Sequence, residues 1–293
     1  MASGLLNWPA VLPDPARYGL AVKPIFIGGM MKSGTSLLRV LLGQHPDLLT
    51  TFETHWFDDA VRQGWSDPGS RRMTFLREFL ELDDAAYAEL VAAKHKEPDR
   101  EFIDLVFALL LDREEKRRWI DKTPDNVLHF ENLRAIWPDA TLIHVTREPR
   151  DCFASWKDKR GDDLETFLAA TNRVWDALGD KIGLGYQPGY LELDYADLVT
   201  DTPTSMANLL RDLGEPWHDS VAEIDLGATE CERETVKRVT GRDSHTNRSL
   251  VRPIFSDSIG QWRHILTPAE AETIVTELAP LYERMGKRWM SSC

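Results

Sequence analysis

The stretch that decides the fold is PIFIGGMMKSGTSLLRVLLGQ, residues 24–44. Residues 24–29 (PIFIGG) predict a short buried strand that ends in glycines. Residues 35–44 (TSLLRVLLGQ) carry apolar side chains at helical spacing, and Ser33 or Thr35 is available to cap this helix. A strand, a tight turn and a helix in this order predict a loop that binds a phosphate group.

The turn between the strand and the helix has the chemistry of an anion site. Its glycines let the backbone approach a ligand, its N–H groups point inward, and the helix N-terminus favours negative charge. In a nucleotide-triphosphate loop, G-x-x-x-x-G-K-[ST], the lysine follows the last glycine, whereas here Thr35 stands there and Lys32 comes earlier. Such a loop suits a single phosphate better than a magnesium-bound triphosphate. The loop residues that we expect to bind phosphate are Lys32, Ser33, Gly34, Thr35 and Ser36.

Composition narrows the class of protein. The chain has 293 residues and a formal net charge of -13, with 42% hydrophobic and 28% charged residues. These values predict a packed globular protein and argue against general binding of nucleic acid or of an acidic membrane surface. The three cysteines are widely spaced, and no pair has metal-ligand spacing, so we expect free thiols in the cytoplasm and no metal site. No signal peptide is evident, and no apolar run approaches the roughly 20 residues of a membrane span.

Strand patterns alternate with helix patterns along most of the chain, which predicts an α/β protein. The expected strands are 24–29, 48–52, 118–121, 139–147 and 189–195, and the expected helices include 35–44, 125–137, 201–213 and 268–285. We expect a single domain, 1–293, in which a central parallel sheet lies between two helical layers, a P-loop-like nucleotide-binding fold. Within it, the helical stretch of about 70–117 is expected to be an insertion, and the polar stretch of about 219–262 a loop-rich cover over the site.

Candidate catalytic residues follow two of the expected strands. The carboxyl ends of strands in an α/β sheet face the ligand crevice, and Glu53 stands at one such end, where its carboxylate is suited to remove a proton from an acceptor hydroxyl. His55 is a second candidate base or acceptor contact, and Trp56 offers a ring that stacks on an acceptor. Lys122 follows the strand 118–121 and is suited to stabilise charge in a transition state.

A second anion site is expected after the strand 139–147. Arg147 ends this strand, and Ser155 lies eight residues later in the following helix, so that a guanidinium and a hydroxyl can converge on one phosphate. Arg150 is a second guanidinium nearby. The alternative is that Arg147 and Arg150 pair with neighbouring carboxylates or with solvent.

Together these motifs resemble the two phosphate-binding signatures of sulfotransferases that use 3′-phosphoadenosine 5′-phosphosulfate (PAPS). Lys-Ser-Gly-Thr follows one strand, and Arg147 and Ser155 form an Arg-x7-Ser pattern after another. Residues 32–58 are similar to the corresponding part of heparan sulfate 3-O-sulfotransferases and, more loosely, of tyrosylprotein sulfotransferases. Residues 190–217 are similar to the strand–Tyr–helix segment of the family, and residues 258–266 (SIGQWRHIL) to its Gly-x-Trp stretch. The matching stretches run in the family's order and with its spacing.

The resemblance implies in-line transfer of a sulfonate from PAPS to an acceptor hydroxyl, without a metal. It implies that the first loop holds the 5′-phosphosulfate, with Lys32 near the bridging oxygen, and that the Arg/Ser pair holds the 3′-phosphate. Glu53 matches the catalytic base of the family, and Lys122 matches the lysine of its EKTP-like stretch. Tyr195 is expected near the adenosine.

The chain departs from the pattern of cytosolic sulfotransferases just before its Gly-x-Trp stretch. Those enzymes carry Arg-Lys-Gly where residues 255–257 are FSD. Further cations for the 3′-phosphate are therefore expected from Arg248 or Arg252.

Three functions remain open at this point. A sulfotransferase is preferred, with a neutral glycan, a lipid or a small molecule as acceptor, because a chain of charge -13 suits a highly sulfated polysaccharide poorly. The second is a P-loop kinase of small molecules. The third is a non-catalytic nucleotide-binding or scaffold protein, in which Glu53 and Lys122 never approach the donor site.

Overall fold

One parallel sheet forms the centre of the molecule. The computed structural model describes residues 23–51, 53–57, 69–80, 82–92, 100–160, 163–185, 187–240 and 250–290. Within these ranges the sheet has five strands in the order β2-β3-β1-β4-β5, and every neighbouring pair is parallel. The strands are β1 (Ile25–Gly29), β2 (Leu48–Thr50), β3 (Arg118–Lys122), β4 (Thr141–Thr146) and β5 (Tyr190–Asp194).

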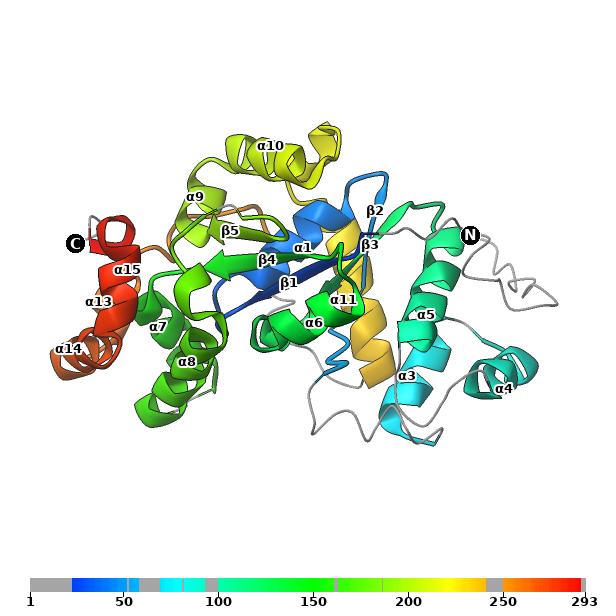
Figure 1. The fold of residues 1–293 in the computed structure, drawn as a ribbon, viewed down its shortest axis with the longest axis horizontal. Helices are drawn as coiled ribbons and strands as arrows, with labels where there is room; N and C mark the ends of the chain where they lie inside the picture. The colour runs from blue at the N-terminus through cyan, green and yellow to red at the C-terminus, as the bar shows by residue number, and fades with distance from the viewer. Residues whose placement is uncertain are drawn as a thin grey trace.

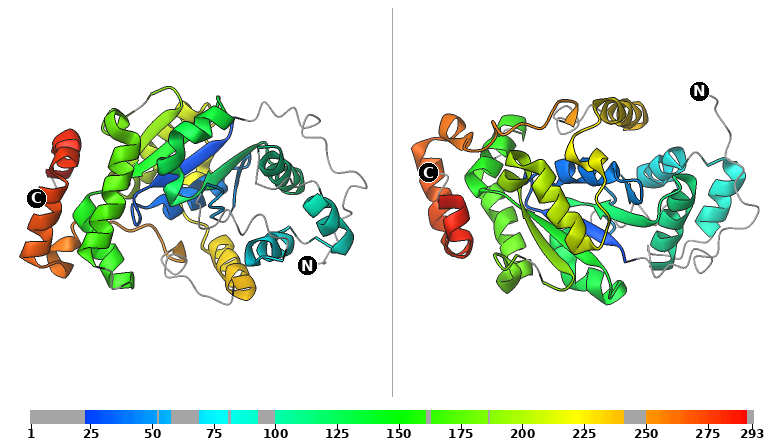
Figure 2. Two further views of the ribbon diagram at one scale, coloured as in Figure 1. Left: turned by 60° about the horizontal axis from the view of Figure 1, so that its bottom comes forward. Right: turned by 90° about the horizontal axis from the view of Figure 1, so that it is seen from above.

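Helices connect the strands and cover the sheet on both sides (Figures 1 and 2). The helices of the first half of the chain are α1 (Thr35–Gly43), α3 (Arg71–Phe79), α4 (Asp84–Ala92), α5 (Arg100–Arg113), η2 (Pro124–His129) and α6 (Phe130–Ile136). Those of the middle are α7 (Pro149–Arg160), α8 (Leu164–Leu178), η3 (Gly179–Lys181), α9 (Tyr195–Thr200) and α10 (Thr202–Leu213). The last are η4 (Asp219–Ala222), α11 (Leu226–Thr240), α13 (Trp262–Ile265), α14 (Pro268–Glu277) and α15 (Ala279–Met290).

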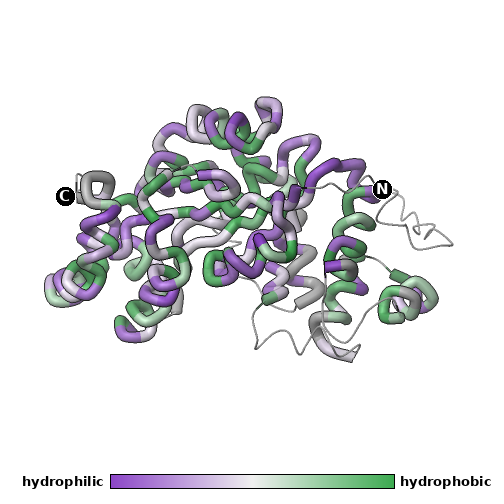
Figure 3. The backbone as a smooth tube through the Cα atoms, in the orientation of Figure 1, coloured by the Kyte–Doolittle hydropathy of each residue, from purple (hydrophilic) through white to green (hydrophobic). Residues whose placement is uncertain are grey.

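The two faces of the sheet carry separate apolar cores, because successive side chains of a strand point to opposite faces. On β1, Ile25 and Ile27 belong to the core beneath α1 and α10, whereas Phe26 belongs to the core on the other face. Figure 3 shows hydrophobic residues along the strands and mixed hydrophobic and hydrophilic residues along the helices. The arrangement confirms the expected three-layer α/β/α fold with a central parallel sheet.

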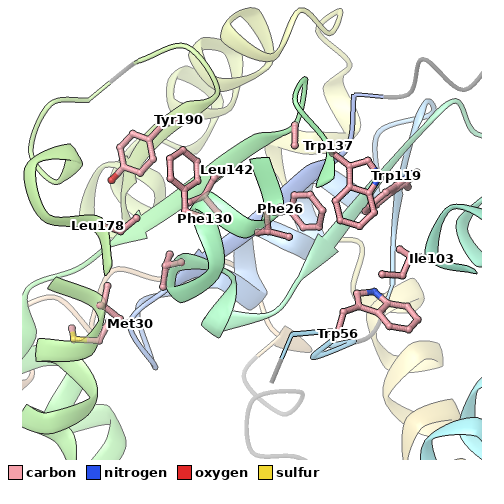
Figure 4. Close-up of a cluster of buried hydrophobic side chains, with 14 of the residues drawn as sticks. Phe26, Met30, Trp56, Ile103, Trp119, Phe130, Trp137, Leu142, Leu178 and Tyr190 are labelled. Atoms are coloured by element: carbon pink, nitrogen blue, oxygen red, sulfur yellow. The ribbon is translucent and has the colours of Figure 1, made fainter. Parts of the chain in front are cut away.

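Aromatic rings fill the second core, between the sheet and helices that include α5 and α6 (Figure 4). Trp119 stacks on Phe107 with ring centroids 4.0 Å apart, and Phe26 meets the edge of Trp119 at 5.4 Å. Such rings bury large apolar areas and stabilise the packing of this layer. They fix β3, and with it Lys122 at its carboxyl end, against the helical layer.

Two groups of helices lie at opposite ends of the molecule. Helices α3, α4 and α5 come between β2 and β3 and lie at one end, while α13, α14 and α15 lie at the other (Figure 1). Within 70–117, the described residues form the helices α3, α4 and α5, and the interpretation of this stretch as an insertion stays a prediction. The stretch 219–262 is not purely loop, because it contains the 15-residue helix α11, which lies beside α3.

Several helix limits differ from the predictions. The N-cap of α1 is Gly34, and no side chain caps it, so the expected cap by Ser33 or Thr35 is wrong. The expected last helix is divided into α14 and α15 at Leu278. Thr267 does cap α14, in a capping box with Glu270.

None of the helices in the described ranges is both long enough and apolar enough to cross a membrane. The cytoplasmic location expected from the cysteines stays a prediction.

Candidate active site

The expected phosphate loop joins β1 to α1 at the carboxyl edge of the sheet. The turn is closed by a hydrogen bond from the Ser33 N–H to the Met30 carbonyl at 3.0 Å. Lys32 and Gly34 have positive φ angles of 69° and 107°. Because no side chain caps α1, the first N–H groups of that helix are available to an anion.

Gly34 is required by its surroundings as well as by its backbone angles. A Cβ atom at this position would lie 2.4 Å from the ring of Tyr195. The Arg147 guanidinium in turn lies against the Tyr195 ring, 4.3 Å from the ring centroid. The loop, the start of α9 and the residue after β4 are therefore packed together, while the expected roles of Tyr195 beside the adenosine and of Arg147 at the 3′-phosphate stay predictions.

The Arg147 side chain ties the loop to the segment that precedes α13. It donates one hydrogen bond to the Lys32 carbonyl and one to the Ser258 carbonyl, both at 2.8 Å. Its Nε atom is buried and, within the described residues, has no hydrogen-bond partner, and the same holds for the Ser33 hydroxyl. Two buried polar groups without partners beside one loop fit a bound anion, because such groups are costly unless a ligand or water satisfies them.

The sequence leaves open that Arg147 and Arg150 pair with neighbouring carboxylates instead of a phosphate. Among the described residues, this alternative applies to Arg150 and not to Arg147. Arg150 donates to Glu148 at 2.7 Å, and its guanidinium lies 3.9 Å from the ring centroid of Trp262. Arg150 is therefore a structural residue of the first turn of α7.

The remaining residues of the expected second anion site are only partly brought together. Ser155 is buried on α7, and in the described part of the chain no direct hydrogen bond joins it to Arg147. Arg252 is exposed, and its guanidinium lies 3.7 Å from the ring centroid of Phe255. Arg248 lies outside the described residues. Within the described residues no contact places Arg252 beside Arg147, and the expected role of Arg248 stays a prediction.

The candidate catalytic residues converge from three segments. Lys122, at the end of β3, donates a hydrogen bond to the Ser36 hydroxyl of α1 at 3.1 Å and another to the Glu53 carboxylate. His55 lies on the other side of this carboxylate, with Nε2 3.4 Å from Oε2. The Lys122 side chain is 3% exposed and the Glu53 side chain 41%, so the carboxylate remains within reach of a substrate.

Charge controls the protonation of this pair. Burial among protein atoms would raise the pKa of Glu53, but the charge of Lys122 and a hydrogen bond with His55 outweigh it and hold that pKa well below its ordinary range. Burial lowers the pKa of Lys122, although the Glu53 carboxylate opposes that effect. The nearby charge of Arg39, a buried residue of α1, lowers the pKa of Lys122 further.

A buried polar network supports the catalytic segment from behind. The Asp121 carboxylate accepts hydrogen bonds from Thr54 at 2.7 Å and from Asn126 at 3.0 Å. The His55 N–H donates to the Thr123 hydroxyl at 3.2 Å, and His55 has a positive φ of 52°. Such strained conformations persist where the surroundings fix them, as at functional sites.

Trp56 does not lie where a substrate contact requires it. Its side chain is buried among hydrophobic residues, with 2% of its surface exposed (Figure 4). Its ring meets Phe102 of α5 edge-on, with ring centroids 6.2 Å apart. The predicted stacking of Trp56 on an acceptor is therefore corrected: the ring belongs to the core. His55, in contrast, stays beside Glu53.

Sequence reasoning missed four residues of the site. Asp121 and Thr123 support the catalytic segment, Ser258 contacts Arg147 and Tyr195, and Arg39 lies near Lys122. Asp121 and Thr123 flank Lys122 in the motif WIDKTP, and that adjacency is the signal that could have identified them. Ser258 begins the stretch SIGQWRHIL, which resembles the family's Gly-x-Trp stretch, whereas Arg39 has no local pattern that marks it.

Replacing Gly34 with alanine is expected to weaken binding of 3′-phosphoadenosine 5′-phosphate (PAP) and to destabilise the fold by about 1–3 kcal/mol. The new Cβ would displace the Tyr195 ring, which supports Arg147. Gly214→Ala is the matched control, because Gly214 also has a positive φ of 74° but has nothing within 4 Å of an added Cβ. Calorimetric titration with PAP measures the affinities, and equal affinity in the two variants would contradict the role given to Gly34.

No group of three or more histidine, cysteine, aspartate or glutamate side chains in the described residues is placed to hold a metal ion. Asp121, the residue before Lys122 on β3, accepts hydrogen bonds from Thr54 and Asn126. The absence of a metal from the reaction stays a prediction.

Comparison with known proteins identifies the family of the chain. The sequence profile described as "Sulfotransferase family" matches residues 24–219, which is more than half of the chain. Protein-tyrosine sulfotransferase 1 of Danio rerio is 25% identical over 285 residues, covering 94% of this chain and 75% of the relative. The human protein of the same name is 23% identical over 272 residues, covering 89% of this chain and 69% of the relative.

Solved structures support the fold. The sulfotransferase domain of the Synechococcus PCC 7002 olefin synthase superposes with a TM-score of 0.60 at 21% identity, covering 87% of this chain and 94% of that one. The sulfotransferase domain from the curacin biosynthetic pathway superposes with a TM-score of 0.52 at 18% identity, covering 88% and 98%. The kinase alternative is not favoured by these relatives. The chain belongs to the sulfotransferase family, and it is an enzyme that transfers sulfonate groups.

Proposed function

We propose that the enzyme moves a sulfonate from PAPS to an acceptor hydroxyl, with Glu53 as the base. One observation carries the proposal: Lys122 contacts both Glu53 and Ser36, so the candidate base and the phosphate loop meet in one site. That contact also argues against a scaffold protein, in which Glu53 and Lys122 would lie away from the loop.

The phosphate loop supplies the binding site for the donor. PAPS supplies the sulfonate on a 5′-phosphate that is a good leaving group. The N–H groups at the start of α1 and the hydroxyls of Ser33, Thr35 and Ser36 would hold that phosphate. Arg147 and Ser155 would hold the 3′-phosphate, and Tyr195 would lie beside the nucleoside. Lys32 would neutralise the charge that collects on the leaving phosphate, as preorganised charges do in a transition state.

The catalytic residues would divide the work at the acceptor. The acceptor oxygen forms the new bond to sulfur, its proton passes to a Glu53 carboxylate oxygen, and the bond from sulfur to the 5′-phosphate breaks. Lys122 would stabilise charge on the sulfonate during transfer. The charge of Lys122 holds the pKa of Glu53 low, so the carboxylate is available in its ionised form to accept the proton.

The acceptor is proposed as a class. The curated relatives named above are called protein-tyrosine sulfotransferases, so a phenolic hydroxyl joins the glycan, lipid and small-molecule hydroxyls as a candidate. The net charge of -13 argues against a densely sulfated polysaccharide. Screening these acceptors with labelled PAPS separates the candidates, since only the correct class becomes labelled.

PAP is expected to stabilise the protein against heat, whereas ATP with magnesium is not. A ligand at about 100 times its Kd stabilises the folded state by about 2.7 kcal/mol, which corresponds to roughly 5 to 10 °C in Tm for a domain of this size. Thermal-shift measurements with each nucleotide make the test. Stabilisation by ATP with magnesium alone would overturn the proposed donor.

A further inference from the structure

Asp151, in the first turn of α7, holds the segment 258–262 in place. One of its carboxylate oxygens accepts the Gly260 N–H at 2.8 Å and the other accepts the Trp262 N–H at 3.1 Å. Its backbone carbonyl accepts the side-chain amide of Gln261 at 3.1 Å. Asp151 is 3% exposed, so these bonds are shielded from water.

The same segment reaches the candidate donor site through Ser258. The Ser258 carbonyl accepts a hydrogen bond from Arg147 at 2.8 Å, and its hydroxyl is 2.7 Å from the Tyr195 hydroxyl. One end of the segment is therefore fixed by Asp151, and the other end orients the two side chains that pack against the phosphate loop.

The rest of the first turn of α7 reinforces this anchor. Arg150 lies on the Trp262 ring and is itself held by Glu148, which also accepts a hydrogen bond from Tyr282 of α15. Gly260 has a positive φ of 73°, which lets the chain turn so that the N–H groups on both sides of Gln261 face one carboxylate.

We propose that Asp151 is a positioning residue for the nucleotide, acting through segment 258–262 to hold Arg147 and Tyr195 in the geometry that binds it. The inference rests on the proposed donor. Asp151 itself contacts no residue of the phosphate loop in the described structure, so its effect on the ligand is indirect. Without the anchor, the Ser258 carbonyl is no longer fixed, and Arg147 loses one of the two bonds that orient it.

Glu192 provides a control, because its carboxylate also holds a loop backbone elsewhere, in addition to accepting a hydrogen bond from the Tyr190 hydroxyl at 3.0 Å and lying 3.7 Å from His144 Nδ1. Its carboxylate accepts the N–H groups of Gly183 at 2.8 Å and Gly185 at 2.9 Å, and its side chain is fully buried. Glu192→Gln and Asp151→Asn therefore each weaken two carboxylate bonds to a loop backbone. Only the loop held by Asp151 contacts Arg147 and Tyr195.

The test compares PAP binding by the two variants in the full chain, by calorimetric titration. We expect Asp151→Asn to weaken PAP binding about tenfold or more, the equivalent of about 1.4 kcal/mol, while Glu192→Gln lowers Tm without changing the Kd. Amide hydrogen exchange should become faster at Gly260 and Trp262 in Asp151→Asn only. A wild-type Kd in Asp151→Asn, with the same loss of Tm as Glu192→Gln, would overturn the inference.

A second variant covers the case in which Asp151→Asn does not fold. Gly260→Ala leaves Asp151 intact but strains the segment at its positive φ, where an added Cβ would lie 2.3 Å from the Arg263 guanidinium. Weaker PAP binding by Gly260→Ala is expected, and unchanged binding would contradict the inference. Failure of the wild-type protein to bind PAP would overturn the proposed donor as well, whereas tight binding that neither variant affects would overturn only the role of Asp151.

Discussion

Glu53→Gln is expected to lower kcat by about 10²–10⁴-fold while PAP still binds with nearly wild-type affinity. The amide keeps the size of the side chain but cannot accept the acceptor proton. Lys122 lies between the Glu53 carboxylate and Ser36 of the phosphate loop. Replacing the carboxylate therefore leaves the loop, Arg147 and Tyr195 in place. Initial rates with labelled PAPS and an acceptor found in the screen give kcat, and calorimetry gives the PAP affinity.

The control for this variant is Glu131→Gln. Glu131 is another glutamate paired with a lysine, 2.9 Å from Lys181, but its side chain is 73% exposed on α6. It should keep the wild-type rate. A Glu53→Gln enzyme that also keeps the wild-type rate would exclude Glu53 as the base.

The parts of the site that could be predicted lie where local patterns meet the edge of the sheet. Lys32 and Gly34 follow β1, Lys122 ends β3, and Arg147 follows β4. The carboxyl ends of parallel strands meet at one edge, so assigning the strands was enough to place these residues near one another. Their contacts with Tyr195, Ser36 and Glu53 then follow from the short distances across that edge.

The parts that could not be predicted depend on packing between distant segments. Trp56 follows Glu53 and His55, and the choice between facing a substrate and filling the core is made by Phe102 of α5, a helix of the insertion. Asp151 looks like a possible partner of Arg147 in the sequence. Its actual partners are N–H groups of Gly260 and Trp262, about a hundred residues later. The Gly-x-Trp stretch is visible in the sequence, but no local pattern pairs it with Asp151.

The start of α1 shows a different limit. Ser33 and Thr35 are favourable cap residues, but the turn needs a positive φ at the N-cap, which Gly34 adopts without strain. The phosphate loop therefore leaves the helix uncapped by any side chain. The usual preference for a side chain that caps the helix N-terminus does not apply here, because the free N–H groups are themselves the expected binding site.

Lys122→Met is expected to lower kcat by about 10²–10³-fold, the effect of losing one preorganised charge in a transition state. Methionine conserves much of the volume of the buried side chain, so the packing of β3 should survive. The variant also removes the charge that holds the pKa of Glu53 low, so the Glu53 carboxyl should titrate at higher pH. Lys116→Met is the control. Lys116 also donates hydrogen bonds within the protein, but its acceptors are the backbone carbonyls of Gly43, His45 and Leu48, away from Glu53.

The double variant Glu53→Gln/Lys122→Met tests whether the pair acts as one unit. Two groups that contact each other in one transition state give strongly non-additive losses, so the double variant should be only slightly slower than the worse single variant.

The affinities for PAPS and PAP give a second test of the pair. When Glu53 no longer accepts a hydrogen bond from Lys122, the lysine can bind the sulfonate, which only PAPS carries, so Lys122 should then favour PAPS over PAP. Glu53→Gln alone is therefore expected to increase the ratio of PAPS to PAP affinity, and the double variant to cancel that increase. Additive losses in kcat, with an affinity ratio that neither substitution changes, would show that Lys122 serves the fold instead of the transfer.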